Sequence, residues 1–512
     1  MNNQSIISKE VNIYVYPEKD ESNPSPPGSI VTIGDLHANA IKFMYMLIER
    51  GVVTGVSKED YEELVKLYKD YSSKAHTLTK GIDNKDKSLV EFYKNSFLQY
   101  LNEFKAIIDK IQVNTDLSVR LIGDELADRG ANDIFVLWIL DKLHKSNLKL
   151  DILISNHGSA VFNTGYYADC CLDNIGIERG FCTSLENLNT LIKAQIVDIS
   201  DVQKIVRTAY EPKVKALAYA ISSNGKEISI FSHAPVCVHI IEGVAQQLAV
   251  AYADETALDL TFTIDRINDA FQKKLKEKQL STLIEFDERK QPSSPISRII
   301  WNRNEDVILK NNIKSYVIYN VHGHTDDLKD INRNGQINLD NTLGKYVDQP
   351  TGKYKLHVCK CYKEKLLLSR KKEKLTRLTS RLEMMQSDNR NKEHQEAAKK
   401  LLDVITNNNN EYEAKVDNVN GLISQLETAL KTLQKNRNFM PKVINLLAHI
   451  VMFILIVPAI YIKFNYGQFY GKCNVIETQS SKLIKDLKKT LESMQAYSSN
   501  SPNNDTSTNP KI

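Results

Sequence analysis

Short apolar runs recur along the first two thirds of the chain, and a polar residue follows each of them within two positions. Five such runs occupy residues 29–33, 118–122, 150–154, 227–231 and 316–321. Runs of this length and composition are typical of strands that are buried on both faces of a sheet. We therefore expect a sheet-based core in which the polar residues gather at the carboxyl ends of the strands.

The stretches between these strands follow a different period. Apolar residues recur every three or four positions between about 55 and 115 and again between about 185 and 220, which predicts two helical insertions. Several of them are aromatic: Tyr61, Tyr68, Tyr71, Phe97 and Phe104. Such insertions can form a cap and a deeper substrate pocket. The alternative is that the aromatic stripe is only helix core.

Beyond residue 363 the pattern changes again. Apolar residues alternate at three- and four-residue spacing on both sides of the asparagine run at 407–410, which predicts a coiled-coil hairpin over 364–437. Residues 443–462 carry no charge, and a helix of that length spans about 30 Å of bilayer core. This segment is predicted to be a membrane helix, with a buried core helix as the alternative. Residues 463–512 are expected to form an amphipathic segment and a disordered tail.

Length and composition narrow the class of protein. The chain has 512 residues, enough for a flexible lead at 1–27 and a large strand-bearing domain at 28–363. A formal net charge of +4 is too small to indicate a nucleic-acid partner. Seven cysteines without a C-x-x-C pair suit a reducing compartment better than a disulfide framework. The polar N-terminus lacks the apolar region of a Sec signal peptide.

Residues that can bind metal ions lie in short motifs where the strands end. Three motifs are followed by two separate histidines. They are Gly34-Asp35-Leu36-His37, the segment 123–130 with Asp124, Asp128 and Arg129, Ser155-Asn156-His157, and then His233 and His324. Oxygen and imidazole ligands without thiolate suit Mn, Fe or Zn.

The order of the motifs predicts a two-metal phosphoesterase. Asp35 and His37 can hold one ion and Asp124 can bridge, while Asn156, His233 and His324 complete the second ion. Two close cations neutralise a phosphate ester and generate hydroxide where bulk water does not. Taken alone, Asp35 could be an ordinary helix N-cap.

The motifs resemble the phosphoprotein phosphatase (PPP) family over about residues 28–345, through Gly-Asp-x-His, Gly-Asp-x-x-Asp-Arg-Gly, Asn-His and two later histidines. The resemblance implies an α/β fold with a metallophosphatase-type β-sandwich flanked by helices. It also implies two divalent ions, with Mn favoured over Fe or Zn, and attack by a hydroxide that bridges them. The implied ligands are Asp35, His37 and Asp124 for the first ion, and Asp124, Asn156, His233 and His324 for the second.

The same resemblance assigns the catalytic side chains. His157 is implied to be the general acid, oriented by Asp128, and Arg129 to bind the phosphate with its planar fork of donors. The segment 300–303, Ile-Trp-Asn-Arg, is similar to the hydrophobic-Trp-x-Arg segment of bacterial members. Arg303 is therefore expected to be a second phosphate ligand.

The chain departs from the family pattern next to the ligands. It has Ala38 where the family has glycine, Gly158 where the family has glutamate, and Ala234-Pro235 where the family has glycine. Such neighbours orient ligands and tune metals, so the changes bear on substrate and rate more than on metal binding. His322 matches no family ligand and is expected to bond locally.

At the level of the whole chain, the divergent motifs, insertions and C-terminal coiled coil resemble the Wip-type type IV secreted effector phosphatases of Legionella. That resemblance implies delivery into a host cell by a non-Sec route and action in the host cytoplasm, near a membrane, on a phosphorylated host protein. It favours phosphotyrosine as the substrate, because a phenol leaves more readily than an alkyl alcohol. Gly158 could also leave room for an aromatic ring.

Other function classes are weighed against this one. A cysteine-dependent phosphatase is excluded because no cysteine has arginine six positions later. General metallophosphodiesterases usually end in Gly-His-x-His and lack the Asp-Arg pair. A Ser/Thr phosphatase and a dinucleoside tetraphosphate hydrolase stay open. A membrane-tethered coiled-coil scaffold, self-associating or bound to a coiled-coil partner, is the alternative outside enzymes.

Overall fold

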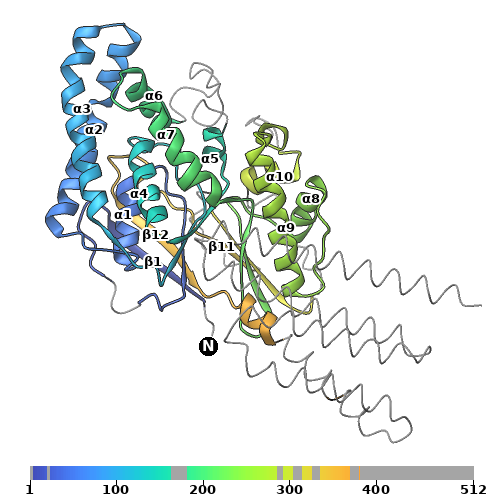
Figure 1. Ribbon diagram of the computed structural model, residues 1–512. Helices are drawn as coiled ribbons and strands as arrows, with labels where there is room; N and C mark the ends of the chain where they lie inside the picture. Colours follow the sequence, from blue (N-terminus) through green and yellow to red (C-terminus); the bar gives the residue numbers. More distant parts are fainter. Residues whose placement is uncertain are drawn as a thin grey trace, which may run out of the picture. The chain divides into compact units, whose positions relative to one another are not determined.

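The structure is a computed structural model that describes residues 4–19, 24–162, 182–284, 292–303, 314–325, 335–369 and 380 (Figure 1). The chain divides into two compact units, residues 1–368 and 369–512. The predicted coiled coil lies outside the described residues except at 364–369 and 380, and the predicted membrane helix and tail lie outside them altogether. Within the described part, no helix is both long and apolar enough to cross a membrane.

A six-stranded sheet carries the first three motifs. Its strands, in spatial order, are β1 (Gln4–Asn12), β12 (Thr351–Cys359), β2 (Ile30–Ile33), β5 (Ser118–Leu121), β6 (Lys149–Leu153) and β7 (Val214–Lys215). Residues 4–12 of the expected flexible lead are thus a strand of the sheet, paired antiparallel with β12. The four strands from β2 to β7 pair in parallel, whereas β12 is antiparallel to both of its neighbours. Parallel pairing brings the carboxyl ends of β2, β5 and β6 to one edge.

A four-stranded sheet carries the two later histidines. Its order is β11 (Gln336–Asn338), β10 (Val317–His322), β9 (Glu227–Phe231) and β8 (Ala218–Ile221), with β8 antiparallel to the rest. A small buried cluster takes members from both sheets, including Leu153, Phe231 and Val321. The Arg120 guanidinium also lies 4.1 Å from the Phe231 ring centroid. The two sheets therefore contact each other through their side chains.

Helices pack on both sides of these strands. Figure 1 shows the long hairpin of α2 and α3 beside α4 on one side and the group α8, α9 and α10 on the other. The bounds are α1 (Ala40–Glu49), α2 (Lys58–Asp83), α3 (Lys87–Lys110), α4 (Asp133–Lys145), α5 (Asn156–Val161), α6 (Thr183–Lys193), α7 (Ile199–Ile205), α8 (Val238–Gln247), α9 (Ala257–Lys276) and α10 (Pro295–Trp301). The antiparallel strands β3 (Val53–Thr54) and β4 (Gln112–Val113) flank the hairpin in sequence, and the helical turns η2 (Val206–Tyr210), η3 (Glu211–Lys213) and η4 (Leu280–Thr282) complete the described elements.

The aromatic residues of the first insertion form its core. Tyr61, Tyr68, Tyr71, Phe97 and Phe104 are all fully buried. Tyr71 meets Phe97 edge to face at 5.1 Å, and Phe104 lies 4.4 Å from Phe135 of α4. Of the two alternatives, helix core is therefore the one that the structure supports for these side chains. The spacing of apolar residues predicts only which helix face is buried, and not what covers it. Here that face packs against the rest of the domain.

Candidate metal centre

The loop after β2 is shaped by a close backbone approach and a sharp turn. A Cβ on Gly34 would lie only 2.1 Å from the Leu339 carbonyl oxygen, so only glycine fits there. His37 and Ala38 then adopt left-handed φ values of 55° and 53°, which are uncommon outside glycine. Asp35 and His37 are both buried as a result.

The loop after β5 is tied to the start of α5 by one hydroxyl group. Ser155 Oγ accepts hydrogen bonds from the backbone N–H groups of Asp124 at 3.0 Å and Gly158 at 2.8 Å. A Cβ on Gly123 would lie 2.5 Å from His233 Nδ1, so this glycine lets the second sheet approach. The serine contact was not predicted, although an N-cap serine before a short helix is a readable signal.

Two groups of buried side chains offer ligand atoms that lie within 4.8 Å of one another. Asp35, Asp124 and His233 form one group, and His37, Asp124 and Asp128 form the other. Asp124 belongs to both groups, which is the arrangement required of a carboxylate that bridges two ions.

Asn156 and His324 adjoin the first group. His233 Nε2 lies 2.7 Å from Asn156 Oδ1 and 3.5 Å from Asp124 Oδ1. The rings of His233 and His324 are 4.8 Å apart, and the His324 backbone N–H donates to Asp35 Oδ2 at 2.9 Å. Five of the six expected ligands are therefore linked by direct contacts.

His37 is held differently from the other five. Its Nδ1 lies 2.9 Å from Asp128 Oδ2, and its Nε2 lies 2.8 Å from the Asn341 carbonyl oxygen. Both ring nitrogens thus have protein partners, and metal binding would replace one of them. The Asn341 contact joins positions 304 residues apart and left no local signal in the sequence.

The hydrogen bonds of the donor set show whether it fits cations. Asp35 Oδ1, Asp124 Oδ1 and His324 Nε2 are buried and have no hydrogen-bond partner among the residues that the structure describes. Buried polar atoms are normally paired because leaving them unpaired costs free energy. Cations at this position would satisfy all three atoms, so the residues fit a metal centre.

The charges of the site agree with this fit. Burial raises the pKa of Asp35 well above its usual value, and Asp340 and Asp124 raise it further. Lys42 is also buried, and its Nζ donates to the Asp35 carbonyl at 2.6 Å and to Asn341 Oδ1 at 2.9 Å. Burial lowers the pKa of Lys42 to about 8. One lysine therefore faces several buried carboxyl groups, an excess of negative charge that cations would balance.

The two histidines of the second sheet are held in the form that binds metals. Burial lowers the pKa of His233 to about 4 and that of His324 well below its usual value. Both rings are therefore neutral near pH 7, as metal coordination requires. His322 bonds locally, with Nδ1 3.0 Å from the Gly323 carbonyl.

Asp128 lies at the centre of the expected catalytic side chains. Its Oδ1 lies 2.8 Å from Arg129 Nη1 and 3.4 Å from His157 Nε2. Burial opposes its ionisation, but His157, His37 and Arg129 together hold the pKa of Asp128 below its usual range. His157 Nδ1 lies 2.8 Å from the Ala127 carbonyl, which fixes the ring on its other side.

Arg303 reaches the same site from the end of α10. Its Nη1 donates to the His324 carbonyl oxygen, and the neighbouring Trp301 ring meets the His324 ring at 5.8 Å. The arginine is thus placed beside His324, which adjoins the group of Asp35, Asp124 and His233.

The helical insertions hold the loop that carries Arg129. The Tyr68 hydroxyl accepts from the Ala131 N–H at 2.9 Å, and Asn132 Nδ2 donates to the Tyr71 hydroxyl at 2.6 Å. From α6, Asn187 Nδ2 donates to the Ala131 carbonyl at 2.7 Å. The sequence did not indicate these contacts, because the hydroxyls belong to residues whose spacing marks them as core.

Two details of the motifs differ from expectation. Gly158 does not leave room for a ring, because a Cβ on it would already lie 2.9 Å from Glu125 Oε1 and from the Tyr210 hydroxyl. The second motif also has three residues between Asp124 and Asp128, one more than Gly-Asp-x-x-Asp-Arg-Gly. Asp124 and Ala127 take left-handed φ values of 53° and 58°, and Asp128 still reaches His157.

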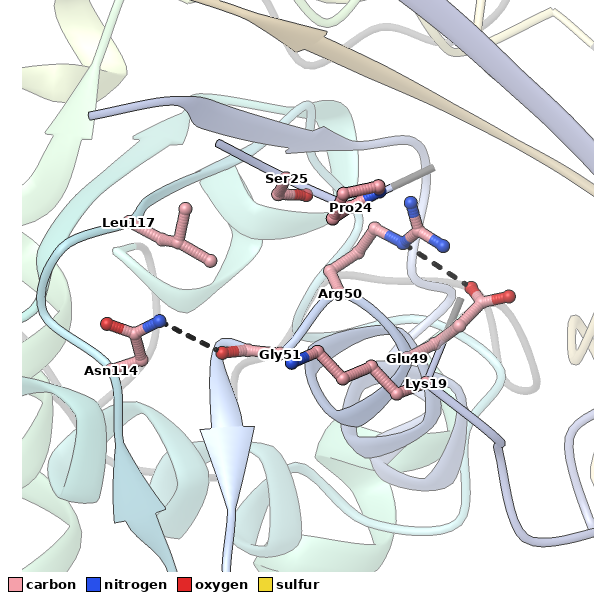
Figure 2. A pocket seen from close by; sticks show the side chains of 8 residues that line it. All are labelled: Lys19, Pro24, Ser25, Glu49, Arg50, Gly51, Asn114 and Leu117. Carbon is pink, nitrogen blue, oxygen red and sulfur yellow. Dashed lines mark hydrogen bonds and ion pairs between the residues drawn. The ribbon is translucent and has the colours of Figure 1, made fainter. Parts of the chain in front are cut away.

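A pocket lies away from this centre. Figure 2 shows it at the C-terminal end of α1, lined by Lys19, Pro24, Ser25, Glu49, Arg50, Gly51, Asn114 and Leu117. Asn114 Nδ2 donates to the Gly51 carbonyl at 3.3 Å across it. None of the expected site residues lines this pocket.

Comparison with known proteins gives the family of the domain. Residues 118–345 match the family model described as WipA-like, phosphatase domain. A solved structure, the phosphatase domain from the Legionella effector WipB, is 27% identical, covers 57% of this chain and 98% of its own, and has a TM-score of 0.51. No curated protein matches the chain. Together with PPP-like motifs at the edges of the sheets, these matches support a Wip-type phosphatase domain in this chain.

Proposed function

We propose that this protein phosphatase depends on two divalent metal ions and hydrolyses phosphoproteins. The observation that carries the proposal is the set of buried ligand atoms on Asp35, Asp124 and His324 that lack hydrogen-bond partners in the described part of the chain. Asn156 and His233 adjoin them, and His37 lies on the side of Asp128. Two bound cations would neutralise the charge of the phosphate and lower the pKa of a water molecule.

The remaining side chains have roles that follow from their positions. Arg129 and Arg303 supply guanidinium groups on two sides of the site and would bind the phosphate oxygens. His157 would donate a proton to the leaving oxygen. Asp128, 3.4 Å from His157 Nε2, would stabilise the protonated ring and orient it.

Metal dependence is tested on the full chain after removal of metal with a chelator. Hydrolysis of phosphopeptides should fall to background and return with Mn, Fe or Zn, with Mn expected to be the most effective. The surface variant Asp116→Asn should behave like the wild type, since it makes the same charge change on an exposed side chain. Activity that survives complete metal removal would exclude the proposed mechanism.

For substrate, we propose that phosphotyrosine is cleaved faster than phosphoserine or phosphothreonine. Phenol, with a pKa of about 10, is a better leaving group than an alkyl alcohol and needs less help from His157. The filled space at Gly158 and the buried aromatics of the insertion give this preference no support. Matched peptides compared by kcat/KM decide between this and a Ser/Thr phosphatase.

We also propose that the chain acts inside a host cell on a phosphorylated host protein, after delivery by a non-Sec route. Similarity to a domain from a Legionella effector supports this. Association with a membrane through residues 443–462 stays a prediction. Carbonate extraction of the full chain from host cells tests it, because a bilayer-spanning segment keeps the chain in the membrane pellet.

A further inference from the structure

Side chains from two distant segments fill the space next to Gly158. A Cβ on Gly158 would lie 2.9 Å from Glu125 Oε1, 2.9 Å from the Tyr210 hydroxyl and 3.0 Å from Ser155 Oγ. The first carbon of any side chain at position 158 would therefore be crowded by these three oxygen atoms. Gly158 lies within α5, a conformation open to most residues, so packing and not backbone geometry requires glycine here.

Glu125 and Tyr210 form a hydrogen-bonded pair in this space. The Tyr210 hydroxyl donates to Glu125 Oε1 at 2.5 Å, and both side chains are fully buried. Glu125 Oε2 has no hydrogen-bond partner within the described ranges. Burying a carboxyl group with one unpaired oxygen costs free energy. Core packing alone therefore gives no reason for a glutamate at this position.

The pair contacts both the loop of Asp124 and the helix of His157. Glu125 directly follows Asp124 in the chain. The Tyr210 ring stacks on Phe162 at the end of α5, with centroids 5.5 Å apart and planes inclined by 17°. Glu125 and Tyr210 thus connect the loop of the expected bridging carboxylate to α5, the helix that carries the expected general acid, at Gly158 and at Phe162.

We propose that Glu125, held by Tyr210, is a positioning residue that takes the place of the carboxylate expected directly after the Asn-His pair. The family pattern has that glutamate at position 158, whereas this chain brings a carboxyl group to the same point from the loop after β5. It sets the position of α5, and so of His157, relative to Asp124. The inference rests on the proposed function, because His157 is the residue that it positions.

A carboxylate exchange in the full chain tests this directly. Gly158→Glu alone forces two carboxyl groups into one space and should lower kcat on a phosphopeptide by roughly 100-fold. Glu125→Ala combined with Gly158→Glu should recover about tenfold of that loss, because one carboxyl group again fills the space. Glu62→Ala, a change on the exposed face of α2, should recover nothing with Gly158→Glu. A double variant no better than Gly158→Glu overturns the proposal.

Gentler variants keep the test valid if Gly158→Glu prevents folding. Glu125→Gln retains an acceptor for Tyr210 and should keep kcat within about threefold, while Glu125→Ala and Tyr210→Phe should each lose about tenfold. The double variant Glu125→Ala with Tyr210→Phe should lose little more kcat than either single variant, because both changes break the same hydrogen bond. The losses should be larger on a phosphoserine peptide than on p-nitrophenyl phosphate, whose leaving group needs little acid. Equal losses on both substrates would mean a merely structural role.

The proposed function and the positioning role of Glu125 can be contradicted by different results. Absence of metal-dependent hydrolysis in the wild type contradicts the proposed function. An active wild type whose Glu125, Tyr210 and Gly158 variants act additively contradicts only the positioning role. If the wild type is inactive, the same variants are compared by the midpoint of thermal unfolding. Additive shifts for Glu125→Ala and Tyr210→Phe would then show that the two residues do not act as one unit.

Discussion

Buried polar atoms are partnered differently in the strand-end loops and in the first helical insertion. In the loops, Asp35 Oδ1 and Asp124 Oδ1 have no hydrogen-bond partner within the described chain. In the insertion, the buried Tyr61 hydroxyl donates to the Ile13 carbonyl at 2.6 Å, and the hydroxyls of Tyr68 and Tyr71 bond the loop after Arg129. Ligand atoms of the loops are thus unpaired where cations are expected, whereas these hydroxyls of the insertion are paired where they brace the fold.

The backbone shows the same contrast. Among non-glycine residues, left-handed φ values between 53° and 64° occur in the loops at His37, Ala38, Asp124, Ala127 and His324. Between α2 and α3 the described chain has one such residue, Lys85. Strained conformations persist only where surrounding contacts impose them. The insertion therefore supports loops whose backbone needs surrounding contacts, and the predictions below test that division of roles.

The largest effect is expected from removing a ligand in the loops. Asp124→Asn, Asp35→Asn or His324→Ala should abolish tight metal binding and lower kcat/KM by roughly 10³-fold or more, since several kcal/mol of transition-state stabilisation is lost. Metal content of the purified chain and kcat/KM are measured together, with Asp116→Asn as the charge-matched control. A variant that keeps both ions and full activity would remove that residue from the ligand set.

Loss of the expected general acid should come next. His157→Ala should retain metal and lower kcat on phosphopeptides by about 10²- to 10⁴-fold, with a smaller loss for good leaving groups. The exposed His239→Ala serves as the control. Full activity on phosphopeptides would show that another group donates the proton.

A smaller effect on activity is expected in the insertion. Tyr68→Phe leaves the Ala131 N–H unpaired and should lower kcat/KM by roughly tenfold through the position of Arg129, with metal content unchanged. Tyr61→Phe removes an equally buried hydroxyl that bonds Ile13 instead. It should cost stability but not activity. Equal kcat/KM values for the two variants would contradict a specific brace on the Arg129 loop.

The effect expected to be smallest on activity concerns stability and pH where the loop meets α4. Asp133 accepts from the Ala127 N–H at 3.0 and 3.1 Å, and burial raises its pKa from 3.8 to about 7. Between these pH values the folded chain keeps a proton that the unfolded chain has lost. The free energy of unfolding should therefore fall as pH rises through this window, by up to about 1.4 kcal/mol per pH unit.

Asp133→Asn removes this titrating group. Denaturant unfolding at several pH values should give a flatter profile for Asp133→Asn than for the wild type, while Asp116→Asn should leave the profile unchanged. Parallel profiles for wild type and Asp133→Asn would mean that Asp133 ionises in the folded chain as it does in the unfolded one.

Sequence patterns predicted the strands and the gathering of the ligands for a clear physical reason. The five apolar runs correspond to β2, β5, β6, β9 and β10. A buried strand can be predicted from the composition of a few consecutive residues. Parallel pairing then places their carboxyl ends together, so Asp35, Asp124 and Asn156 could be grouped without knowledge of tertiary contacts.

What fills the space around the ligands was decided only by the tertiary structure. Tyr210 meets Glu125 across 85 positions, and Asn341 meets His37 across 304. Periodicity marks a residue as buried but does not name its partner. It therefore could not tell that Gly158 is packed rather than open, or that the insertion tyrosines brace a loop. Packing of distant segments sets those volumes, and no local pattern records it.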